Sequence, residues 1–150
     1  MKRSLLYRLF RLGAMPTRAR TELEGEGIVV ADEGMPGRFI TRHVNAPGKR
    51  YRFRSEGFSG WLAVTRRRVI CHTFSKRQIN IGVDDPRIGD LFVDVPDEDT
   101  LSVSFESSSF REGWQGVIEL RFRTGRAAEF EDALLAVGAS RGRLGLQPSG

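Results

Sequence analysis

The alternation of apolar and polar residues predicts short β-strands over most of the chain after Glu22. Side chains of a strand point alternately to its two faces, so runs of this kind bury one face and leave the other wet. Turn-forming clusters rich in Gly, Pro, Asp and Ser separate the runs. The predicted strands are residues 26–31, 38–44, 49–53, 60–65, 68–74, 78–83, 90–95, 100–106 and 116–124.

Two segments have helical rather than strand periodicity. Near the C-terminus, Ala127, Phe130, Leu134 and Val137 recur at intervals of three and four residues and predict an amphipathic helix. Residues 1–12 predict a short amphipathic helix with an apolar face, and residues 13–21, with Gly13 and Pro16, predict a linker. The residues that this N-terminal helix offers for contact with a membrane or a partner are Leu5, Leu9, Phe10 and Leu12.

Short strands at near-regular spacing, followed by one helix, favour a mainly β antiparallel barrel or roll closed by a C-terminal amphipathic helix. With 150 residues the chain suits one domain. We predict an N-terminal basic helix and linker at residues 1–20, a domain at 21–140 and a flexible tail at 141–150. Trp61 and Trp114 are expected to be partly buried, because aromatic side chains usually supply core area.

The composition offers little chemistry for catalysis. Cys71 is the single cysteine, and it neighbours His72, so in a strand the two side chains point to opposite faces. Cys71 is interpreted as a small buried apolar residue. The acidic clusters Asp84–Asp85 and 97–99 adjoin prolines and are interpreted as solvated turns. We therefore expect no enzyme activity, no metal site and no cofactor.

The net charge of +5 is unevenly distributed. Residues 1–20 hold six basic and no acidic residues, and residues 38–77 hold eleven basic residues against Glu56 alone. Residues 78–140 reverse the sign, with five arginines against thirteen acidic residues. This polarity favours an anionic partner on one side, unless the two halves pair across a closed sheet.

The stretch GKRYRFRSEG places arginines at alternate positions, with Tyr51 and Phe53 between them. On a strand these arginines are expected to share one face while the two aromatic residues bury on the other. Together with two basic turns they could converge at one rim of a barrel, where arginine binds phosphate oxygens through its planar fork. The predicted ligand-binding residues are Lys49, Arg50, Arg52, Arg54, Arg66, Arg67, Arg68, Lys76 and Arg77.

The stretches GWLAVTRRRVI, INIGVDDPRIGDLFV and GVIELRFRTGRAAEFEDAL resemble bacterial pleckstrin-homology-like (PH-like) and GRAM-type domains over residues 58–138. The resemblance implies a barrel whose final helix plugs one open end. Lipid-binding PH domains of eukaryotes carry a lysine followed by a basic-x-Arg signature, and Lys49, Arg52 and Arg54 have that composition. Here, however, two predicted strands precede them.

These observations favour a non-catalytic binding module that docks on anionic lipid headgroups or on a protein partner. A nucleic-acid-binding module is the alternative, since the interleaved RYRFR could stack bases and hold phosphates. A small enzyme ranks third. No apolar run reaches the roughly 20 residues that span a bilayer, and Arg8 and Arg11 argue against a secretory signal. We expect a cytoplasmic protein that can associate with the inner face of the membrane; an organelle transit peptide is the other interpretation of the N-terminus.

Overall fold

A computed structural model describes residues 3–4 and 12–145. One eight-stranded sheet forms the body of the protein, with the strand order β4-β3-β2-β1-β7-β6-β5-β8. Neighbouring strands are antiparallel except β5 and β8. The strands are β1 (Ile28–Ala46), β2 (Lys49–Thr65), β3 (Arg68–Thr73), β4 (Lys76–Gly82), β5 (Phe92–Asp97), β6 (Thr100–Glu106), β7 (Gln115–Arg123) and β8 (Ser140–Arg141).

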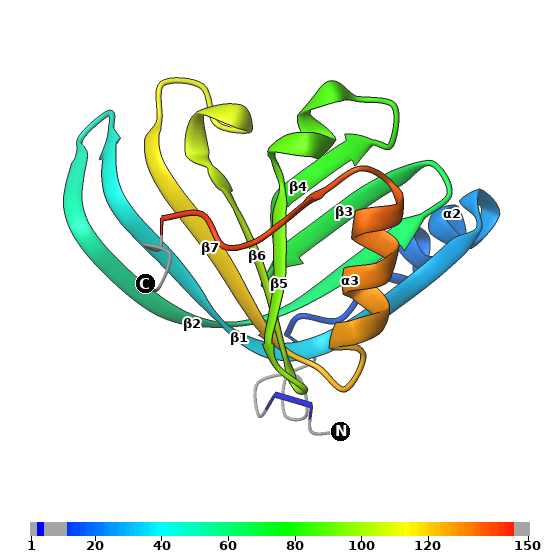
Figure 1. The fold of residues 1–150 in the computed structure, drawn as a ribbon. Coiled ribbons are helices and arrows are strands. Elements are labelled where there is room, and N and C mark those ends of the chain that lie inside the picture. The colour runs from blue at the N-terminus through cyan, green and yellow to red at the C-terminus, as the bar shows by residue number, and fades with distance from the viewer. Residues whose placement is uncertain (1–2, 5–11, 146–150) are drawn as a thin grey trace.

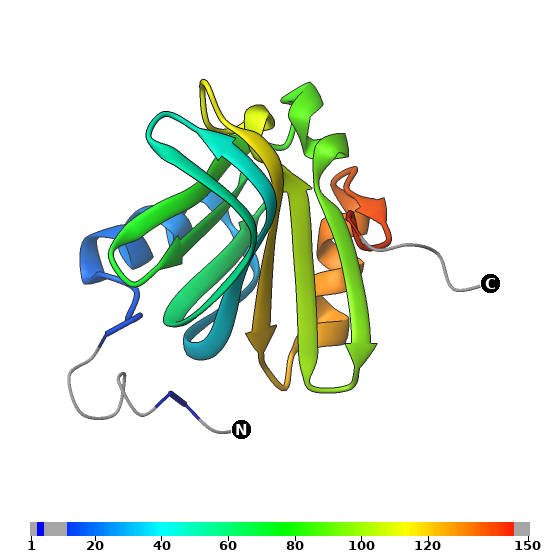
Figure 2. The same ribbon diagram turned by 90° about the vertical axis from the view of Figure 1, so that its left-hand side faces the viewer.

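The sheet curls into a half-barrel, which Figure 1 shows from its open side and Figure 2 shows after a quarter turn. Two α-helices, α2 (Thr17–Glu26) and α3 (Ala127–Ala136), accompany it, with short 3-10 helices η1 (Pro86–Asp90) and η2 (Ser107–Ser109) in the connections. The mainly β fold with a C-terminal helix is therefore confirmed.

The first two strands are much longer than predicted. Residues 26–31 and 38–44 were expected as separate strands, but both belong to β1, and residues 49–53 and 60–65 both belong to β2. The break expected near residue 34 is a β-bulge between Asp32 and Met35, where Gly34 has a φ of 65°. A bulge bends a strand without ending it, and glycine adopts this conformation at little cost.

Helix α2 occupies part of the segment that was predicted to be a linker. Pro16 immediately precedes it, a position where the missing N–H of proline costs nothing because a helix does not use it. The helix runs to Glu26, so strand structure begins at Ile28 and not at Glu22. Leu23, which is fully buried, faces the sheet, and this anchor was not recognised in a stretch that is otherwise polar.

The main core fills the inner, concave face of the sheet. Helix α3 closes it with four buried residues, Ala127, Phe130, Ala133 and Leu134. The predicted apolar stripe contained all of these except Ala133. Val137 follows the helix and is partly buried against the same core. Phe58 and Phe122 meet edge to face beneath the helix, with ring centroids 5.3 Å apart.

A second, smaller apolar cluster lies on the outer face, where α2 packs (Figure 1). Trp61 and Ile70 of the sheet contact Met15 and Leu23 there. Trp61 is 1% exposed, so it is more deeply buried than predicted, whereas Trp114 is half-buried as predicted.

Residues 141–145, which were expected to be a flexible tail, have defined contacts. Arg141 belongs to β8, and the backbone N–H of Leu144 donates to Ser104 Oγ at 2.9 Å. At the other end, the predicted helix of residues 1–12 falls largely outside the described residues; Leu12, which is described, lies in a turn and is 41% exposed. Within the described ranges, no helix combines the length and apolar character that crossing a bilayer requires.

Candidate binding cavity

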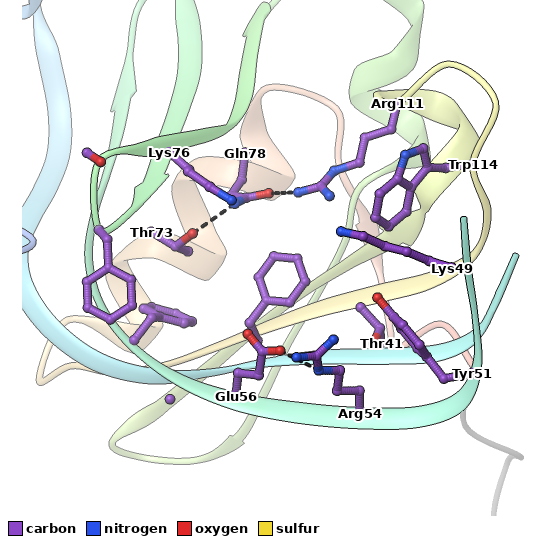
Figure 3. Close-up of a pocket in the computed structure, with 15 residues that line it drawn as sticks. Thr41, Lys49, Tyr51, Arg54, Glu56, Thr73, Lys76, Gln78, Arg111 and Trp114 are labelled. Carbon is purple, nitrogen blue, oxygen red and sulfur yellow. Dashed lines mark hydrogen bonds and ion pairs between the residues drawn. The ribbon is translucent and has the colours of Figure 1, made fainter. Parts of the chain in front are cut away.

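A cavity of about 400 Å³ opens at one end of the half-barrel. Three segments that are distant in sequence surround it: the β1–β2 hairpin, the β3–β4 hairpin and the loop that joins η2 to β7 (Figure 3). Its lining residues are Phe39, Thr41, Lys49, Tyr51, Arg54, Glu56, Gly57, Phe58, Thr73, Phe74, Ser75, Lys76, Gln78, Arg111 and Trp114.

Positive charge dominates this cavity. Lys49, Arg54, Lys76 and Arg111 line it against Glu56 as the one lining carboxylate. Glu56 forms an ion pair with Arg54, and both side chains are about half exposed. A compact anion in the cavity would meet at least three cations that this carboxylate leaves uncompensated.

Arg111 is the most constrained of the four cations. Its guanidinium donates a hydrogen bond to Gln78 Oε1 and lies over two rings, 4.8 Å from the Trp114 centroid and 5.6 Å from the Phe39 centroid. Burial lowers the pKa of Arg111, and Tyr51 offsets this only in part. Within the described residues no carboxylate lies within ion-pair distance of it, which is costly for a partly buried charge.

Polar and aromatic groups complete the cavity wall. Gln78 Nε2 donates to Thr73 Oγ1 at 2.8 Å, which fixes the amide so that its oxygen faces Arg111. The hydroxyl of Thr41 is buried without a hydrogen-bond partner in the described part of the chain. Such an orphan group in a cavity wall is a candidate contact for a bound polar atom.

Phe74 marks the outer rim, at the turn between β3 and β4. It is 38% exposed and has a φ of 54°, a conformation that bulky side chains rarely adopt. Strain of this sort persists where the surrounding structure over-determines it and is frequent at functional sites. The rim thus offers an apolar side chain close to the cations of the cavity.

The structure divides the predicted ligand-binding residues among several places. Lys49, Arg54 and Lys76 line the cavity. Arg50 and Arg52 line a shallow hollow on the other side of the β1–β2 hairpin, with His43 and Asn45. The remaining four residues lie elsewhere: Arg66 and Arg67 in the turn between β2 and β3, Arg68 at the start of β3, and Arg77 on β4 opposite His72 of β3.

The expected single arginine face is therefore wrong, because Arg54 lines the cavity while Arg50 and Arg52 line the hollow on the other side. His43 has a φ of 54° and lies in a β-bulge of β1 opposite Gly116 of β7. A bulge re-aims the side chains around it. This bulge falls in the β1–β7 ladder, whereas β2 keeps its register with β1 from Ser59 to Lys49, so the bulge does not account for Arg54 and Tyr51 both lining the cavity three residues apart.

The aromatic residues between those arginines also depart from expectation. Tyr51 is half-buried, but Phe53 is 60% exposed, with the Arg42 guanidinium over its ring at 5.9 Å. At the start of β3, Arg68 pairs with Glu22 and Glu26 of α2, each at 2.9 Å. This arginine therefore anchors a helix.

Arg111, Gln78 and Trp114 are cavity residues that sequence reasoning missed. The segment SSSFREG was interpreted as a turn cluster, which is correct for its backbone but silent about its side chains. An arginine flanked by aromatic residues, as in FREGW, was the available signal. Nothing local, however, indicated that this loop folds over the β3–β4 hairpin.

The two candidate reactive groups lie apart, as predicted. Cys71 is fully buried in the main core, and burial raises the pKa of its thiol far above the ordinary range. His72 lies on the outer face, where its ring stacks on Trp61 with centroids 4.5 Å apart. No group of three or more metal-ligating side chains occurs in the part of the chain that is described.

Neither known protein families nor curated proteins match this chain in sequence comparison.

Proposed function

We propose that this protein is a non-catalytic, PH-like binding module that docks on an anionic membrane surface through the cavity. The observation that carries the proposal is the convergence of Lys49, Arg54, Lys76 and Arg111 around one cavity with a single lining carboxylate. The long antiparallel meander closed by α3 supports the PH-like part of the proposal.

A membrane surface fits the rim better than a free anion does. Phe74 is exposed beside Lys76, and Trp114 is half-buried beside Lys49, whose ammonium lies 5.5 Å from the indole centroid. Cations attract anionic headgroups, and amphipathic aromatic side chains favour the interface between headgroups and acyl chains. Apolar and electrostatic contacts together provide the two weak signals that stable attachment usually needs.

The test is co-sedimentation with phosphatidylcholine vesicles, with and without phosphatidylserine. Wild-type protein should sediment with the anionic vesicles only, and less at high salt, because screening weakens surface electrostatics. Each basic residue near an anionic surface contributes about 1 kcal/mol. The double variant Lys49→Gln/Lys76→Gln should therefore bind about 30-fold more weakly.

The matched control is Arg67→Gln, which removes an exposed cation from the turn beside α2. It should sediment like wild type, and both variants should keep the wild-type melting temperature. Equal loss in the control would mean that net charge matters and the cavity does not. Binding to a single-stranded oligonucleotide but not to anionic vesicles would contradict the membrane proposal and favour the nucleic-acid alternative.

A further inference from the structure

A second arginine-rich hollow lies on the outer face, across the sheet from the cavity. Arg38 of β1, Arg121 and Arg123 of β7, and Arg143 of the C-terminal segment line it, and its volume is about 470 Å³. We call it the outer hollow. Asp97, the last residue of β5, is the one carboxylate among its lining residues.

Two of these arginines are held in place from below by Glu119. Its carboxylate is completely buried and forms ion pairs with Arg121 at 3.2 Å, Arg143 at 3.1 Å and Arg42 at 2.9 Å. It also accepts a hydrogen bond from Ser102 Oγ at 2.7 Å. Burial alone would raise the pKa of Glu119, but these donors hold it below its usual range. One buried negative charge thus orients three guanidinium groups and leaves an excess of positive charge.

The other two arginines form no ion pair within the described residues. Arg38 lies directly opposite Arg121 across the β1–β7 ladder, and like charges in that position destabilise a sheet. Its guanidinium is fixed by Ser55, which accepts from Nε at 3.0 Å. Arg123, on the same face, makes no ion pair or side-chain hydrogen bond within the described residues. The pKa of Asp97 is lowered mainly by the hydrogen bonds from Thr100 and Asp99, and less by the charges of Arg123 and Arg121.

We propose that the outer hollow is a second anion site, which binds the phosphate groups of a small, multiply charged phosphate ester. Guanidinium groups bind phosphate oxygens in pairs, and here the forks are held by Glu119 and Ser55 before any ligand arrives. Asp97 competes weakly, because the backbone N–H of Asp99 donates to it at 3.0 Å. The volume falls in the range of small-ligand pockets.

The probe is pyrophosphate, titrated at constant ionic strength and followed by NMR and calorimetry. Backbone amides of Arg38, Thr100, Arg121 and Arg123 should shift and saturate together. The double variant Arg38→Gln/Arg123→Gln removes two exposed cations without touching Glu119. Since each removed guanidinium takes away charge-assisted hydrogen bonds to the phosphates, this variant should bind pyrophosphate at least about tenfold more weakly.

The cavity variant Lys49→Gln/Lys76→Gln is the control and should bind pyrophosphate at the outer hollow like wild type. The hollow variant should conversely keep its binding to anionic vesicles, so failure of this proposal and failure of the membrane proposal are distinguishable. Shifts confined to the cavity, shifts that sodium chloride reproduces, or unchanged affinity in the hollow variant would overturn the proposal. Loss of vesicle binding in the hollow variant, without pyrophosphate binding by wild type, would assign these arginines to lipid headgroups instead.

Discussion

His72 couples the stability of the outer cluster to pH. Its ring stacks on Trp61, and burial, followed by the charge of Arg77, lowers its pKa, while a backbone hydrogen bond with Ser75 acts in the opposite direction. A base whose pKa is lowered by folding takes up a proton more readily in the unfolded chain. Stability should therefore be complete above the unfolded pKa of about 6.5 and decline as the pH falls below it.

Urea unfolding measured from about pH 8 to about pH 5 tests this titration. Wild-type protein should lose stability over that range, and His72→Gln should lose less because the titrating group is gone. His43→Asn is the control, since asparagine tolerates the positive φ of this exposed position, and it should keep the wild-type pH dependence. If His72→Gln retains the full dependence, His72 is not its source.

Individual positions show what the sequence could and could not predict. The fates of Cys71 and His72 followed from alternation, because β3 keeps a regular ladder with β2 at those residues although its ladder with β4 shifts register between them. The direction of Arg54 did not, although the β1–β2 ladder keeps its register on both sides of it. The bulge at His43 depends on the approach of Gly116, 73 residues further along the chain, and no local pattern records that contact.

Helix α2 is attached to the sheet by one apolar residue and a set of ion pairs. Leu23 is fully buried against the outer cluster, and Arg68 holds Glu22 and Glu26. The Glu22 side chain is exposed, so its pair contributes little, whereas the Arg68–Glu26 pair is largely buried and shares the attachment with the leucine. Leu23→Ala should cost about 2–5 kcal/mol of unfolding free energy, measured by urea denaturation.

Tryptophan emission provides a local measurement of the same change. In a Trp114→Phe background the signal comes from Trp61 alone, and Leu23→Ala should shift its emission to longer wavelength as water reaches the indole. Glu24→Ala changes an exposed position of the same helix and should leave stability and emission unchanged. Unchanged emission in Leu23→Ala would mean that α2 does not cover Trp61.

The elements differ in how well periodicity reveals them. Helix α3 was predictable because its apolar stripe is continuous, and most of the strands because they alternate. Helix α2 was not, because a helix that buries only Leu23 lacks a stripe and looks like a polar linker. The length of β1 and β2 was also hidden, since Gly34 marks a bulge in β1, and Gly57 and Gly60 are paired within β2 where glycine usually indicates a turn.

The molecule as a whole presents cations on both faces of one curved sheet. The cavity lies toward the inner face at the hairpin end, and the outer hollow lies on the opposite face near the β5–β6 turn. The alternating strands β1 and β7 connect them, since the cross-strand pair Phe39 and Leu120 faces the core while the adjacent pair Arg38 and Arg121 faces outward. The predicted polarity along the chain thus becomes two separate basic regions, and arginines from the acidic C-terminal half contribute to both.

Both regions depend on the packing of α3 against the core, which gives a test at the scale of the whole molecule. Leu134 is 1% exposed and belongs to the buried face of α3. Leu134→Asp would place an unpaired charge in the core and should cost more than about 4 kcal/mol, a large part of the stability of a domain this size. Circular dichroism should show cooperative unfolding at lower temperature, with vesicle and pyrophosphate binding lost together.

The control for this variant introduces the same charge on the exposed side of α3. Ala136→Asp lies in the last turn of the helix, where a negative charge is mildly unfavourable, and should cost less than about 1 kcal/mol. It should therefore keep both binding activities. A folded Leu134→Asp protein with an unchanged melting temperature would show that α3 does not close the core. It would also contradict the expectation that the packing of this helix supports both basic regions.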